Sequence, residues 1–216
     1  MKYKLTNETI IIDGHTLHRI IAMEDNNEMD IRKGDLGGFV ENVNNLDNYG
    51  NSWIYDDACV YGNAHVCDDA IIMNKAKVYG NAKVYGNAVV GGYATVHNNA
   101  KIYQNAQVLG HATVFGDGCV FGNARVFGHA TVFGCANIGS EANIYGRCTI
   151  TGDALIDGFA SVYDNAIVSG KAKVRDSSMI YGRCKVYGTA VIADCAEITG
   201  NVEIYNTAIT GYTKMF

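Results

Sequence analysis

The stretch Val78-Tyr79-Gly80-Asn81-Ala82-Lys83-Val84-Tyr85-Gly86-Asn87-Ala88 repeats a unit of six residues almost without change. The unit reads aliphatic, aromatic, Gly, Asn, Ala, variable. Its aliphatic position recurs every six residues from Ile54 to Ile204, and all 26 units have Val or Ile there. Four places later, 21 units have Ala. An internal repeat this regular predicts a solenoid.

Side-chain alternation gives the geometry of each unit. Alanine and the aliphatic residue are two apart on a strand, so both face inward, whereas the variable and aromatic residues face outward. Gly-Asn tolerates a positive φ and supplies a corner. Sides of six residues close most simply as a triangle, so three units make one coil. We therefore predict an all-β fold, a triangular parallel β-helix, with eight to nine coils over residues 54–209.

The flanks of the repeat predict three regions: an N-terminal β cap at 1–45, the β-helix at 46–209, and a tail or partial coil at 210–216. We expect cap strands at Thr9–Ile12 and His18–Ala22, joined by an Asp13-Gly14 hairpin turn. The glycine-rich segment Lys33–Val40 lacks the spacing of a phosphate loop and is expected to be a tight-turn connection. The last strand edge must be covered by the tail or paired with another chain.

Composition excludes several classes of protein. With 48% hydrophobic and 18% charged residues the chain folds, and its net charge of −5 predicts no nucleic-acid binding. The first 50 residues hold nine acids against five bases. No apolar segment resembles a signal peptide or a membrane span, so we expect neither.

No two of the seven cysteines are 18 residues apart, and Cys148 and Cys184 take inward positions. This pattern predicts no disulfide and a cytoplasmic location.

The repeat resembles that of the hexapeptide-repeat superfamily, whose fold is the left-handed parallel β-helix. The aromatic second position and the segments Gly37–Val40 and Trp53–Tyr55 resemble a group of uncharacterised bacterial and prophage solenoid proteins. The resemblance covers about three quarters of the chain. It implies a left-handed coil and a bacterial or phage origin.

Outward aromatic residues predict binding surfaces. Residues three units apart stack, so Tyr145, Tyr163 and Tyr181 form one ladder. Ladders of like side chains stabilise parallel sheets, and an exposed apolar ladder also marks a contact with a partner. We expect a non-catalytic scaffold that forms a homo-oligomer or binds a host protein, with no metal and no cofactor. The binding surface is predicted to comprise Leu109, His111, Phe115, Phe121, Phe127, His129 and Phe133, with the four phenylalanines girding all three faces.

His111 and His129 carry the alternative function. They are 18 residues apart and occupy the same corner in the repeated segment Gly-His-Ala-Thr-Val-Phe-Gly. This segment resembles one in hexapeptide-repeat acyltransferases, which implies a corner histidine as general base and an acyl-thioester donor such as coenzyme A. Those transferases usually interrupt the coil with an extruded loop, which the unbroken register here lacks.

Overall fold

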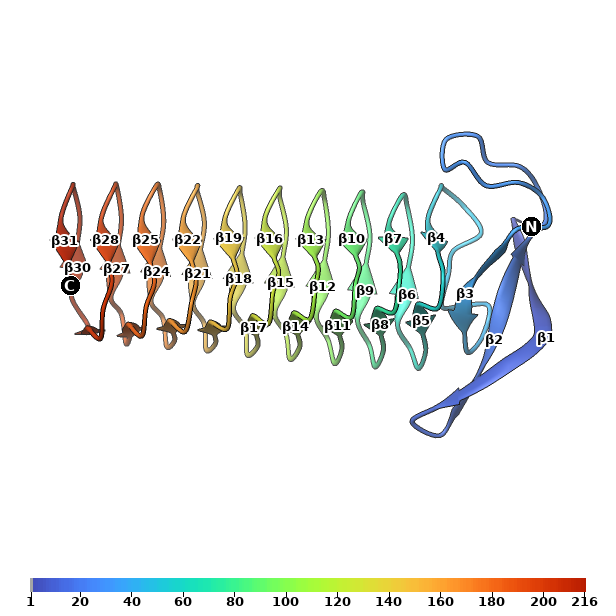
Figure 1. Ribbon diagram of the computed structural model, residues 1–216, viewed down its shortest axis with the longest axis horizontal. Coiled ribbons are helices and arrows are strands. Elements are labelled where there is room, and N and C mark those ends of the chain that lie inside the picture. The colour runs from blue at the N-terminus through green and yellow to red at the C-terminus, as the bar shows by residue number, and fades with distance from the viewer. Residues whose placement is uncertain (1) are drawn as a thin grey trace.

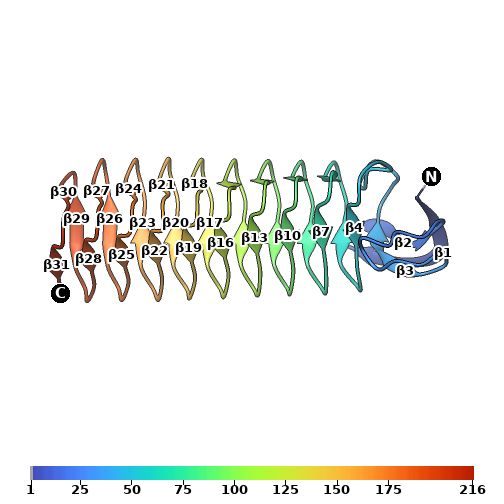
Figure 2. The same cartoon turned by 90° about the horizontal axis from the view of Figure 1, so that it is seen from above.

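The computed structural model describes residues 2–216 and shows a straight all-β rod with the N-terminal cap at one end (Figure 1). It has 31 strands and, over these residues, no helix. Successive coils stack along the axis as three sheets, and the same regular stack is seen after a turn of 90° (Figure 2). The prediction of an all-β parallel solenoid is confirmed. Residues 2–216 contain no helix with the length and apolar character needed to cross a membrane.

Sheet I has twelve strands: β1 (Tyr3–Ile12), β2 (His15–Ala22), β3 (Leu36–Val40), β5 (Cys59–Val60), β8 (Lys77–Val78), β11 (Thr95–Val96), β14 (Thr113–Val114), β17 (Thr131–Val132), β20 (Thr149–Ile150), β23 (Ile167–Val168), β26 (Lys185–Tyr187) and β29 (Glu203–Tyr205). Sheet II has ten: β4 (Trp53–Ile54), β7 (Ile71–Ile72), β10 (Val89–Val90), β13 (Gln107–Val108), β16 (Arg125–Val126), β19 (Asn143–Ile144), β22 (Ser161–Val162), β25 (Met179–Ile180), β28 (Glu197–Ile198) and β31 (Lys214–Met215). Sheet III has nine: β6 (His65–Val66), β9 (Lys83–Val84), β12 (Lys101–Ile102), β15 (Cys119–Val120), β18 (Asn137–Ile138), β21 (Leu155–Ile156), β24 (Lys173–Val174), β27 (Val191–Ile192) and β30 (Ala208–Ile209).

The core is a column of small and aliphatic side chains. Strands of the rod pair in parallel with the equivalent strands of the next coil, as in Val96↔Val114. The inward alanines and the Val or Ile residues are almost all fully buried, and the two cysteines predicted to face inward, Cys148 and Cys184, are buried and free. Ser178 also takes the small position, where its hydroxyl donates to the carbonyl of Arg175 at 2.7 Å. This bond satisfies a polar group that burial would otherwise penalise.

The corners adopt the left-handed conformation that Gly, Asn and Asp tolerate best. Gly80 has a φ of 70°, and Asn98 takes the same corner one coil later with a φ of 59°. The next residue along stacks as an amide ladder, in which Asn63 donates to Asn81 at 3.1 Å and Asn81 donates to Asn99 at 3.1 Å. These bonds join successive coils at the corner, where the strands themselves do not pair.

The N-terminal hairpin forms as predicted, and its strands extend further than the predicted ranges. β1 and β2 pair antiparallel around Asp13 and Gly14, which have φ of 51° and 84°. Positive φ at both turn residues is the conformation that favours Asp-Gly hairpins.

The expectation of a tight-turn connection at Lys33–Val40 was wrong for its second half. Gly34 does turn, with a φ of 99°, but β3 is a strand that pairs antiparallel with β2 and in parallel with β5. Gly37 and Gly38 lie in this strand and pack closely against the backbone of residues 54–58. A Cβ at Gly38 would collide with the Ile54 side chain and lie 2.5 Å from the carbonyl oxygen of Ala58.

The expectation of an unbroken register was wrong near the C-terminal end. Val191 pairs with Ala208 and Ile192 with Ile209, so this last coil is one residue shorter than the others. Ala208, expected to face inward, is exposed, and Ile209 takes the core position. The tail then continues the coil, since β31 pairs with β28.

Candidate functional site

The outward side chains of each sheet form columns because the pairing register is constant. Thr95, Thr113, Thr131 and Thr149 are consecutive partners on sheet I. The aromatic position stacks in the same way, two residues further along each strand. Every coil therefore adds one rung to each column, and the sequence at that rung determines the local surface.

The longest aromatic column lies on sheet I. It runs through Tyr61, Tyr79, His97, Phe115 and Phe133, with ring centroids 4.8–5.0 Å apart and interplanar angles of 1–8°. Its first rung is fixed to the cap, because the Tyr61 hydroxyl donates to the Asp13 carboxylate at 2.8 Å. The column thereby continues from the hairpin into the middle of the rod.

The predicted tyrosine ladder lies on sheet II. Phe127 stacks on Tyr145 at 5.0 Å, and Tyr145, Tyr163 and Tyr181 follow at 4.7 Å each. Burial, together with the neighbouring tyrosines, raises the pKa of Tyr163 to about 12. The Tyr181 hydroxyl donates to the Glu197 carboxylate at 2.5 Å, which anchors the last rung.

Sheet III holds a column of three rings. Tyr85, Tyr103 and Phe121 stack at 5.1 and 5.3 Å. Phe121 then leans over Gly139, whose missing side chain makes room, since a Cβ there would lie 2.6 Å from Cε2 of the Phe121 ring. Phe121 is thus packed against the next coil of the rod.

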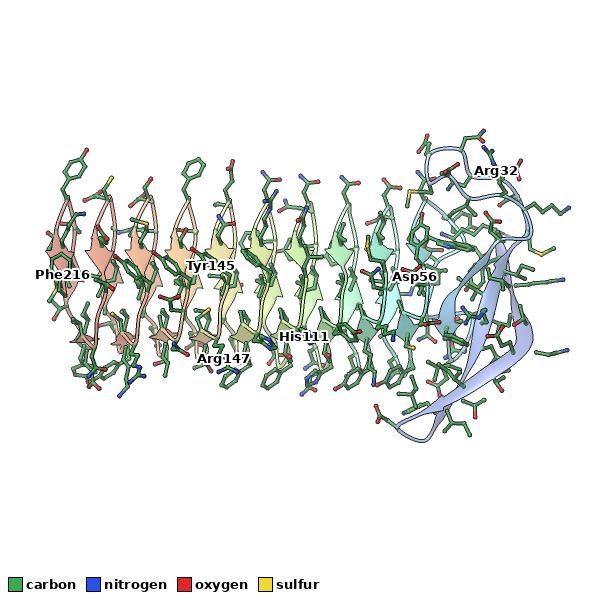
Figure 3. All side chains as sticks on the ribbon, in the orientation of Figure 1. Arg32, Asp56, His111, Tyr145, Arg147 and Phe216 are labelled. Atoms are coloured by element: carbon green, nitrogen blue, oxygen red, sulfur yellow. The ribbon has the colours of Figure 1, made fainter. Side chains whose placement is uncertain are left out.

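The two histidines of the alternative function lie on the corner between sheets II and I, which we call the II–I corner. Tyr93, His111 and His129 stack there at 4.8 Å per step, and Arg147 is the next residue of the column. Both histidines are exposed, and within residues 2–216 neither imidazole forms a hydrogen bond. Figure 3 labels His111, Arg147 and Tyr145 on the rod.

The predicted binding residues thus divide into two groups. Leu109 and Phe127 lie on sheet II, Phe115 and Phe133 on the adjoining sheet I, and the two histidines on the corner between them. Phe121 lies apart, on sheet III. The four phenylalanines do occur on all three faces, but they are rungs of three separate columns.

The stacked columns expose the edges of their rings. Because the ring planes are nearly parallel and succeed one another along the rod, each face is covered by the neighbouring ring. Stacking a sugar or a base requires an open ring face. Within a column the exposed ring edges offer apolar contact to another protein surface instead.

The sequence interpretation missed an apolar patch at the start of sheet II. Ile71, Met73 and Val89 are half-buried outward residues there, and Met73 and Leu109 close over Gly91 from both sides. A shallow hollow of about 300 Å³ is lined by Tyr55, Asp56, Ile71 and Met73. The sequence did carry a signal for this patch. The variable position of the unit holds Ile71 and Val89 here, whereas it holds a polar residue in many other units.

The cap holds a second, polar cleft of about 410 Å³ next to Trp53. Lys2 lines it and donates to the carbonyl oxygen of Ser52 at 2.8 Å. Burial lowers the pKa of Lys2 to about 8. Across residues 2–216, no three His, Cys, Asp or Glu side chains are grouped so that they could hold a metal ion.

Comparison with known proteins agrees with the fold. Residues 76–92, which contain the stretch Val78–Ala88, match the family model described as the YdcK beta solenoid repeat. No curated protein matches the chain. The matched segment is one short part of a rod whose other coils share its geometry, so the chain is a β-solenoid repeat protein in its architecture.

Proposed function

We propose that this protein is a rigid, non-catalytic scaffold that binds another protein through its outward ladders. The observation that carries the proposal is the charge distribution of sheet II. From β7 to β25 its outward positions include one charged residue, Arg125, whereas those of sheet III from β6 to β27 include five, Lys83, Lys101, Asp157, Lys173 and Arg175. Extended surfaces with little charge and many aromatic residues are typical of protein interfaces.

The ladders also suit the surface to binding. Tyr145 and Tyr163 of sheet II are each held between two stacked rings, with interplanar angles of 3° for the steps from Tyr145 to Tyr181. Side chains already ordered in the free protein lose little conformational entropy when a partner arrives. The partner is a host protein or a second copy of this chain. A cytoplasmic location, supported by seven free cysteines, a prophage origin and membership of the hexapeptide-repeat superfamily belong to the same proposal.

No specific observation favours the acyltransferase alternative. A general base needs a substrate pocket and, usually, a group that orients the imidazole. His111 and His129 are exposed on a ridge and stack on Tyr93 and on each other.

The test compares two matched double variants. Phe127→Ser with Tyr163→Ser removes two rungs of sheet II, and Leu155→Ser with Val191→Ser changes two outward residues of sheet III. We expect the sheet II variant alone to lose self-association in sedimentation equilibrium, or to lose retained proteins in a quantitative pull-down. Equal behaviour of both variants would contradict the proposal, and so would acyl-coenzyme A turnover that His111→Ala abolishes.

A further inference from the structure

We propose that the surface formed by sheet II, the II–I corner and sheet I, from residue 70 to residue 151, binds an acidic protein segment that inserts an apolar side chain. We call this surface the basic strip. The inference rests on the proposed function and names the chemistry of the partner. The inference combines two features of this surface: the five segments of the strip lack carboxylates, and an apolar hollow lies at one end of it.

The basic strip covers five successive coils, at residues 70–79, 88–97, 106–115, 124–133 and 142–151. None of these segments contains Asp or Glu, although the chain as a whole has a net charge of −5. The nearest acids lie at its borders. Asp57 and Asp164 limit it along the rod, and corner residues such as Asp117 and Glu141 limit it across the faces. The strip does hold basic and imidazole side chains: Lys75, Lys77, His97, His111, Arg125, His129 and Arg147.

The cations of the basic strip are free to meet a ligand. Within residues 2–216, Lys75, Arg125 and Arg147 form no ion pair. Lys75 Nζ lies 5.8 Å from the centre of the Tyr93 ring, so its charge is held over the corner column. Arg147 follows four coils later, which is roughly 19 Å along the rod at the usual strand spacing. An extended segment of about six residues spans that distance.

The hollow supplies the apolar anchor point. It lies between Tyr55, Ile71 and Met73. Lys75 follows Met73 by two residues and lies on the adjoining II–I corner. The Asp56 carboxylate at its border accepts bonds from the Asn74 backbone and side chain at 2.9 and 3.1 Å, so this acid is already engaged. A partner that placed an apolar side chain in the hollow would bring its neighbouring residues over Lys75 and Tyr93. Interfaces of this kind combine a buried apolar anchor with a polar rim.

The positive charge of the basic strip favours an acidic partner over a second copy of the chain packed face to face. Two copies meeting through this strip would bring Lys75, Arg125 and Arg147 close to the same residues of the other copy, with no carboxylate on either surface to compensate. Like charges across an interface disfavour association, and complementary charges promote it. The strip therefore fits a partner rich in Asp and Glu.

The experiment is a selection of random dodecapeptides, displayed on yeast, against the full chain at moderate salt. We expect the enriched peptides to share an apolar residue flanked by at least two acids. Synthetic peptides of that consensus should bind about tenfold more weakly, or worse, to chains carrying Arg125→Glu with Arg147→Glu, or Met73→Ser. The matched controls on sheet III, Lys83→Glu with Lys101→Glu and Leu155→Ser, should leave binding within about twofold.

Three results would overturn the inference. They are a consensus without net negative charge, an effect of the sheet III variants equal to that of the strip variants, and no enrichment at all. A neutral consensus that still requires Met73 would reject the acidic partner but keep the scaffold function. A chain that dimerises through the strip, and dimerises more tightly after charge reversal, would identify a second copy as the occupant and reject the acidic segment.

Discussion

A Cβ atom is excluded at one glycine of this chain and accommodated at another, although neither glycine has a positive φ. At Gly38 a Cβ would collide with Ile54 and approach the Ala58 carbonyl oxygen. At Gly118 a Cβ would point into the column of buried alanines, 3.5 Å from Cγ1 of Val114 and 3.1 Å from the Phe115 carbonyl oxygen. The first glycine is required by a close approach of backbones, and the second occupies a position where 21 of the 26 units have alanine.

These contacts predict opposite effects of one substitution. We expect Gly38→Ala to lower the free energy of unfolding by about 1–3 kcal/mol through overpacking. Gly118→Ala should raise it by about 0.4–1 kcal/mol, because alanine restricts the unfolded chain and fits the folded one. Urea denaturation followed by circular dichroism measures both. If the two variants shifted the midpoint in the same direction, our description of these two positions would be wrong.

Tyr61 links the cap to the rod through its hydroxyl group. Its hydroxyl donates to Asp13 at the hairpin tip, and the residue is 2% exposed. Burial, followed by the bond to Asp13, raises the pKa of the hydroxyl well above its usual value near 10. The unfolded chain therefore releases this proton first as the pH rises, so the stabilisation is complete below about pH 10 and decreases above it.

Replacing Tyr61 with Phe tests that link. The variant should lose about 1 kcal/mol of stability at neutral pH, which is the usual contribution of one hydrogen bond. It should also show a smaller loss of stability above pH 10 than the parent chain. Thermal melts at pH 7, 9 and 10.5 measure both effects, with Tyr79→Phe as the control for a stacked tyrosine that has no hydroxyl partner within residues 2–216. Equal alkaline slopes in all three chains would contradict this role for Tyr61.

The elements show how far the sequence alone could predict the structure. The six-residue period predicts the rod strands and the stacking of equivalent residues in successive coils, because side-chain alternation and the corner residues act locally. The hairpin follows from Asp13-Gly14 for the same reason. β3 could not be predicted, since Gly37 and Gly38 are explained only by the distant contact with Ile54 and Ala58. The shortened last coil did leave a signal, because Thr210 replaces the expected aliphatic residue and Ile209 precedes it.

The candidate site was predicted less completely than the fold. The period placed each outward residue in its column, including the stacked pair His111 and His129. It did not show that Phe121 would pack over Gly139, because that depends on how a ring tilts. It also missed the hollow beside Met73, since a hollow arises from side chains on neighbouring coils and has no local sequence pattern.

The coils of the rod should be interchangeable for folding. Stability in such a rod is approximately a sum over neighbouring coils. Deleting 160–177, which is three whole units, joins equivalent corners and should leave the β spectrum and cooperative unfolding intact. Deleting 160–176 instead leaves one extra residue in the joined corner, which should strain that corner and lower the stability of the neighbouring coils. Proteolysis and circular dichroism distinguish the two chains, and equal stability of both would contradict the modular description.

The same modularity localises function. If the basic strip binds the partner, removing a coil should weaken binding only where that coil contributes contacts. Deleting residues 70–87 removes the hollow with Lys75 and Lys77, and deleting 160–177 removes a coil beyond the strip. Both deletions keep the repeat in phase.

The most direct test measures the affinity of the selected acidic peptide for these two shortened chains. We predict that the chain lacking 70–87 binds the peptide about tenfold more weakly than the full chain, or worse, while the chain lacking 160–177 binds within about twofold. Equal affinity of the two shortened chains would contradict binding by the basic strip, because binding would then not depend on the coil that carries the hollow.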